Sequence, residues 1–290
     1  MYYLKKSLSN IYNSIKEHKF IFILLIILEL FFLFTLVFIS VNYHLKILTD
    51  AQNIIVPLQN SNIYNVTNVA DTQPFIDEMY GIYKNYNSML SNLKNYVFWL
   101  IGIFLVLNSL LWIISSWLLD KYLFNKDITG FCKSKVCNIL KLKVFYKMWL
   151  KFFASALVLF VPIIVIGYYL LVWLLRTEIG MDSFAQATQV LVYLLIFFYF
   201  FLISAYAFIG ITSWKNFFKS TFIVLSKKIH YTLLVLLINL VLISLSLYLI
   251  YLSTNSQIFS LMLIFSILFV VVLVLARLFW ISCLNLLVKE

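Results

Sequence analysis

The sequence predicts an all-α, polytopic transmembrane helix bundle with about six spans. Hydrophobic residues make up 64% of the 290 residues and charged residues only 11%, whereas soluble domains are roughly half apolar and a quarter charged. Long apolar runs recur along the chain, and basic residues gather between alternate runs. A soluble protein of this composition could not cover its surface with polar groups, but lipid accepts apolar side chains.

Six apolar runs have the length of a membrane-spanning helix, which is about 20 residues. They lie at about 20–41, 96–118, 152–175, 188–212, 231–252 and 259–284. Lipid offers the backbone no hydrogen-bond partner, so each run is expected to be a helix. The first run is longer than a signal-peptide core and lacks an Ala-x-Ala-like end, so we expect it to be retained. Residues 1–290 are expected to form a single membrane domain.

The basic residues predict the orientation of the spans. Four of the 22 fall on one side, namely Lys46, Lys84, Lys94 and Arg176, and the other eighteen fall on the opposite side. Cytoplasmic loops carry an excess of Lys and Arg, so both termini are expected on the cytoplasmic side of the plasma membrane. This asymmetry explains the net charge of +11 without a nucleic-acid partner.

Three basic segments on that side carry apolar residues at helical spacing. The first stripe is Leu4, Leu8, Ile11 and Ile15, and the third is Trp214, Phe217, Phe218, Phe222 and Leu225. The middle segment, around Val136 to Trp149, is a looser version. Amphipathic helices of this kind lie on the bilayer with their lysines toward anionic lipid headgroups, which are the expected partners. The equal spacing of Lys6–Lys19 and Lys215–Lys228 suggests three helical hairpins, although repetition of a loop-and-anchor pattern explains it equally well.

The largest segment on the other side covers about residues 42–95. Apolar residues on one face predict a helix from about Phe75 straight into the second span, and the first helix is expected to continue past His44 toward Ile54. The result is an external helical hairpin whose tip is the polar stretch 57–71. Asn65 begins an Asn-Val-Thr sequon and is a candidate glycosylation site. Chance occurrence in an Asn-rich chain explains that sequon equally well.

No motif for catalysis or cofactor binding was found, so the sequence predicts neither an enzyme nor a cofactor. His18, His44 and His230 are far apart and lack a second ligand at helical spacing, so no metal site is predicted. The cysteines, Cys132, Cys137 and Cys283, fall on the predicted cytoplasmic side and are expected to be free thiols.

Three residues interrupt the apolar spans: Glu29, Pro162 and Arg277. Ionisable residues inside spans are rare and usually functional. Glu29 is either a transport site or a carboxyl hydrogen-bonded between helices, and Arg277 is either its partner or a residue that snorkels to the headgroups. The two lie at similar depth in antiparallel helices, so a contact between them is a specific hypothesis. Pro162 is expected to kink the third span.

The motif Ser213-Trp214-Lys215-Asn216-Phe217-Phe218-Lys219-Ser220, followed by Lys227-Lys228 at the start of a span, carries a resemblance to a known group. With Lys5-Lys6-Ser7 near the N-terminus, it resembles uncharacterised six-span archaeal membrane proteins. These are distantly similar to the membrane domain of glycerophosphodiester phosphodiesterases. The resemblance implies a membrane module without the catalytic domain.

Two functional hypotheses follow. The first is a non-enzymatic scaffold or accessory subunit that binds a protein partner through its external hairpin. The second is a small transporter or channel with Glu29 in the translocation path. An intramembrane lipid enzyme ranks third because the spans lack clustered acids, histidines or a nucleophile.

Overall fold

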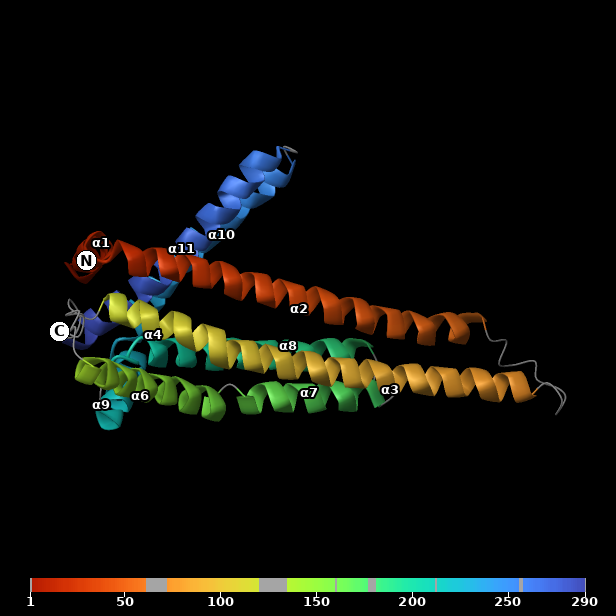
Figure 1. Cartoon of the computed structure of the whole chain (residues 1–290). Coiled ribbons are helices and arrows are strands. Elements are labelled where there is room, and N and C mark those ends of the chain that lie inside the picture. Colours follow the sequence, from red (N-terminus) through yellow and green to blue (C-terminus); the bar gives the residue numbers. More distant parts are fainter. Residues whose placement is uncertain are drawn as a thin grey trace. The chain divides into compact units, whose positions relative to one another are not determined.

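The structure is a computed structural model that describes residues 2–60, 72–119, 135–159, 161–176, 181–211, 213–255 and 258–289 (Figure 1). Within these ranges the regular structure is helical, and no strand occurs. Six helical stretches are long and apolar enough to cross a membrane. They confirm the predicted all-α, polytopic bundle, and the chain is a multi-pass membrane protein.

The helices follow one another with short breaks. They are α1 (Tyr2–Glu17), α2 (Lys19–Asn60), α3 (Thr72–Ile103), the π-helix η3 (Phe104–Asn108), α4 (Ser109–Leu118), α6 (Lys135–Leu159), α7 (Val161–Arg176), α8 (Met181–Tyr206), α9 (Trp214–Lys227), α10 (Ile229–Asn255) and α11 (Phe259–Lys289). The second predicted span is therefore the continuous succession of α3, η3 and α4.

The chain forms two compact units, which are described separately. Unit 1 consists of Met1–Phe32, Phe104–Ile163 and Gln186–Glu290, and unit 2 consists of Leu33–Ile103 and Ile164–Ala185. The boundaries fall inside α2, at the α3–η3 junction, and inside α7 and α8. The chain thus passes from one unit to the other along helices.

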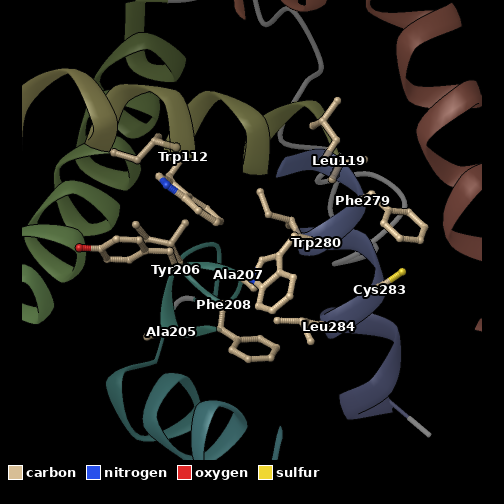
Figure 2. Close-up of a cluster of buried hydrophobic side chains, with 14 of the residues drawn as sticks. Trp112, Leu119, Ala205, Tyr206, Ala207, Phe208, Phe279, Trp280, Cys283 and Leu284 are labelled. Atoms are coloured by element: carbon tan, nitrogen blue, oxygen red, sulfur yellow. The ribbon is translucent and has the colours of Figure 1, made fainter. Parts of the chain in front are cut away.

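The C-terminal half of α11 lies at the centre of unit 1. Its residues from Leu278 to Leu287 are all buried, and α11 contacts α1, α4, α9 and α10. Figure 2 shows Trp280 of α11 beside the end of α8, with Trp112 of α4 across from it. The Trp112 and Tyr206 rings are 5.5 Å apart. This half of α11 is apolar on nearly every face, which is the pattern of a helix surrounded by protein.

Helix α8 ends at Tyr206, before the end predicted for the fourth span. Residues 207–210 form a buried turn. Side chains of α11 bind its carbonyl groups: Trp280 Nε1 donates to Ile203 O at 3.0 Å, and Asn285 Nδ2 donates to Ala207 O at 2.7 Å. The prediction that the span reaches residue 212 is wrong because apolar residues stay buried in a packed turn as well as in a helix. Non-helical backbone at membrane depth is tolerated where protein covers it.

The two outer amphipathic segments do form helices, α1 and α9, but each packs one face on protein. Helix α1 lies against α11 and buries Tyr3, Ser7, Ile11 and Ser14. Leu8, which belongs to the predicted apolar stripe, is exposed. The buried face is therefore rotated toward the two serines, whose small side chains permit a close approach of helices.

Helix α9 has two different apolar faces. Phe217 and Val224 are buried in unit 1, whereas Phe218 and Phe222 are exposed. One face therefore packs on protein and the other is open to lipid. The middle segment is not a separate helix, because residues from Lys135 onward form the beginning of α6.

A one-residue break separates each of these helices from the long helix that follows. It falls at His18 between α1 and α2, and at Lys228 between α9 and α10. In both places the carbonyl of the break residue accepts hydrogen bonds from the amides three and four residues later. The predicted repetition of a short basic helix before a span is thus present at these two places as the same local turn.

In unit 2, α2 and α3 form an antiparallel hairpin joined by side chains. Asn92 Nδ2 donates to Asp50 Oδ2 at 2.8 Å, and the hydroxyl groups of Ser40 and Tyr96 are 3.1 Å apart. Helix α2 has 42 residues, so it is roughly 63 Å long at about 1.5 Å per residue. The hydrocarbon core of a bilayer is only about 30 Å thick, so half of this helix lies beyond it.

Candidate functional site

The structure brings Glu29 and Arg277 together inside unit 1. Glu29 is in the N-terminal third of α2 and Arg277 is in the C-terminal half of α11. Their side chains retain only 3% and 11% exposure. Both residues lie in candidate membrane spans, so the pair is an intramembrane ion pair.

The two side chains meet through both ends of their charged groups. Arg277 Nη2 donates a hydrogen bond to Glu29 Oε1 at 3.0 Å, and Nη1 lies 2.7 Å from Oε2. The second approach lacks the direction of a hydrogen bond, so it is a charge–charge contact. A planar guanidinium facing a carboxylate in this way limits the relative rotation of the two helices.

Aromatic groups surround the pair. The guanidinium carbon of Arg277 lies 5.8 Å from the centre of the Trp112 ring, and Tyr199 of α8 interacts electrostatically with both charged groups. A cation–π contact is worth about 0.5–2 kcal/mol. Removing one partner of a buried ion pair costs about 3–5 kcal/mol. The carboxylate is therefore the main partner of Arg277, and the ring is secondary.

Lys151 of α6 is a second buried cation, and sequence reasoning missed it. Its side chain is 1% exposed. Its ammonium lies 5.9 Å from the centre of the Phe217 ring, and no carboxylate among the described residues pairs with it. The sequence analysis counted it as a loop lysine because it stands at the edge of an apolar run. Only the packing of α9 against α6 reveals that it is enclosed.

Two asparagines in the apolar spans were also missed. Asn239 of α10 donates to Ala276 O at 3.1 Å, and Asn285 donates to Ala207 O. Each joins its helix to a neighbour at a backbone carbonyl. An amide group within an apolar run is a signal of such a contact, because an unpaired amide in lipid is costly.

Pro162 is the second residue of α7, and α6 ends three residues earlier at Leu159. A proline at this position is in the first turn of a helix, where its missing N–H costs nothing. The chain therefore changes from one helix to another here, in the region where a kink was predicted. Asn65, Cys132 and Cys137 lie outside the described residues. Cys283 is a free, buried thiol.

One face of α2 carries exposed apolar side chains over most of its length in unit 2. They are Phe34, Phe38, Val41, Leu45, Leu48 and Ile55, hereafter the α2 stripe. The intervals of three, four and seven residues place them on one side of the helix. The first three belong to the predicted span 20–41, where lipid covers them, and the last three lie beyond it.

Groups of three or more metal-binding side chains (His, Cys, Asp, Glu) do not occur within the described ranges. Comparisons of the chain with protein-family models, curated proteins and solved structures found no match. The resemblance to six-span archaeal membrane proteins therefore stays a prediction.

Proposed function

We propose that this chain is a non-enzymatic membrane scaffold or accessory subunit that binds a protein partner through the hairpin of α2 and α3. The α2 stripe carries the proposal. Leu45, Leu48 and Ile55 continue the lipid-facing side of α2 beyond the apolar run and leave large apolar side chains exposed to water. A contiguous apolar surface of this kind is typical of an interaction site.

Further support comes from the polar contacts that hold the hairpin together. The Asp50–Asn92 hydrogen bond lies beyond the apolar run of α2, at the level of the exposed residues. It fixes α2 against α3, so the stripe is presented on a preformed surface. Binding to a preformed surface avoids the entropic cost of ordering it.

The distribution of basic residues supports an orientation with both termini in the cytoplasm and the hairpin outside the cell. In that orientation the exposed lysines of α1 and α9, such as Lys5, Lys16, Lys215 and Lys219, meet anionic headgroups of the inner leaflet. Transport through Glu29 requires a carboxylate that water can reach. The ion pair with Arg277 and the burial of both groups favour a structural role for Glu29 instead.

The test is affinity purification of the full chain in mild detergent, with quantification of co-purifying protein. Leu48→Ser combined with Ile55→Ser should lower the yield of partner about tenfold, because two interface residues worth more than about 1 kcal/mol each are removed. The matched control is Thr49→Ser with Asn53→Ser, which changes exposed residues at the same level of α2 but off the stripe. Equal partner yield from both variants, or no stoichiometric partner with the wild-type chain, would refute the proposal.

A further inference from the structure

An apolar cavity of about 390 Å³ lies between α6, α8 and α9 in unit 1. Its walls include Ala154 and Val158 of α6, Phe201 of α8, and Phe218 and Phe222 of α9. This volume is within the range of about 300–1,000 Å³ that is typical of ligand sites. Phe218 and Phe222 belong to the lipid-open face of α9, so the cavity can be reached from the bilayer.

Lys151 lies at one end of this cavity. It is one helical turn before Ala154 and Ser155, both of which line the cavity. Its ammonium faces the ring of Phe217, another residue of the lining. The cavity therefore has a cationic end at Lys151 and an apolar length that continues along α6 to Val158.

The charge of Lys151 has no protein counter-ion in the described part of unit 1. The carboxylates there are Glu17 and Glu29. Glu29 pairs with Arg277, and Glu17 does not pair with Lys151. Lys147 adds a second positive charge one turn away. A buried cation without an anion is unfavourable, and an adjoining apolar cavity does nothing to offset that cost.

We propose that the cavity binds an anionic phospholipid, with one acyl chain between α6, α8 and α9 and the phosphate paired with the Lys151 ammonium. One molecule then supplies both features that the protein lacks, namely an anion at the end of the cavity and hydrocarbon along its length. A free phosphate ion would leave the apolar walls without an occupant. This site is separate from the α2 stripe and does not depend on the function proposed for it.

The orientation of α6 agrees with a lipid of the leaflet next to the termini. Lys151 is nearer the start of α6 than Val158, and α9, which carries Phe217, contacts the C-terminal half of the chain's last helix. The phosphate would therefore lie toward the end of unit 1 that carries α1 and the C-terminus. The acyl chain would point toward the bilayer centre, as in an ordinary membrane lipid.

The experiment places the full chain in nanodiscs that contain equal amounts of phosphatidylglycerol and phosphatidylcholine with the same acyl chains. Native mass spectrometry after detergent release counts the lipids that remain bound. The wild-type chain should retain one phosphatidylglycerol in preference to phosphatidylcholine. Lys151→Gln should lower this preference at least about fivefold, since a lysine near the headgroups contributes on the order of that factor. Lys151→Arg should preserve it.

Two matched variants separate the cavity from general surface charge. Lys147→Gln removes an exposed lysine of the same helix and should leave the preference unchanged. Ala154→Phe fills the cavity and should abolish retention of either lipid, whereas Leu157→Phe, outside the lining, should have no effect. Equal retention of the two lipids by the wild-type chain would overturn the proposal without recourse to any variant. Unchanged preference in Lys151→Gln, or unchanged retention in Ala154→Phe, would overturn it as well.

Discussion

Replacing Arg277 by Gln leaves the Glu29 carboxylate buried without its partner. The carboxylate is 3% exposed and loses both contacts, at 3.0 Å and 2.7 Å. Breaking a buried pair from one side costs about 3–5 kcal/mol. For a domain of 150–250 residues each kcal/mol lowers the melting temperature by about 2–4 °C, so Arg277→Gln should lower the melting temperature by roughly 10 °C.

Glu29→Gln should have a smaller effect, because Arg277 retains other partners. The Trp112 ring still offers a cation–π contact of about 0.5–2 kcal/mol. The arginine side chain is 11% exposed, and its long stem allows it to reach toward the headgroups. We expect a loss of about 2 kcal/mol. In the double variant no charge is stranded, so its loss should be about 2–3 kcal/mol smaller than the sum of the single losses.

The assay is thermal unfolding of the purified full chain in mild detergent, followed by intrinsic tryptophan fluorescence. Lys227→Gln, which removes an exposed lysine, serves as the control and should leave the melting temperature unchanged. If the losses in the two single variants add up in the double variant to within about 0.5 kcal/mol, the two residues are energetically independent. Glu29 would then again be a candidate transport site.

Two further predictions concern α9 and the orientation of the chain. Phe217→Ala should destabilise the protein by about 3–5 kcal/mol, as for a large side chain deleted from a core, whereas Phe222→Ala should have little effect in the same unfolding assay, because Phe217 is 1% exposed and Phe222 is 69% exposed. In a chain without its native cysteines, Lys84→Cys should react with an impermeant thiol reagent on intact cells and Lys5→Cys only after permeabilisation. Both lysines are exposed, so labelling of Lys5→Cys from outside would contradict the proposed orientation.

Much of the fold could be predicted because the bilayer imposes one requirement on every span. The apolar runs mark the helices, and the continuation of α2 to Asn60 and of α3 from Thr72 follows from helical spacing in the intervening segment. The contact of Glu29 with Arg277 could be proposed from depth alone, because few partners are available to a charge in lipid. The positions of the Trp112 and Tyr199 rings around it could not.

The errors arise where apolar residues meet protein instead of lipid. Hydropathy is the same for both surroundings, so the end of α8 was placed beyond Tyr206 and the buried face of α1 was assigned to Leu8 instead of Ser7. Lys151 was misread for the same reason. Its enclosure depends on the packing of α9 against α6, two helices that are distant in the sequence, and a local pattern carries no information about such a contact.

The hydrogen bonds between α11 and the end of α8 also set an order for biogenesis. The carbonyls of Ile203 and Ala207 receive their donors from Trp280 and Asn285, which are synthesised 77 and 78 residues later. At roughly 5–20 residues per second, the exit of α8 waits roughly 4–15 s for its partners. During that interval the nascent chain presents unsatisfied backbone groups near the membrane, which lipid cannot bind. Completion of the last helix is thus the step that commits the chain to its mature state, and a chain that stalls before it is a natural substrate for membrane quality control.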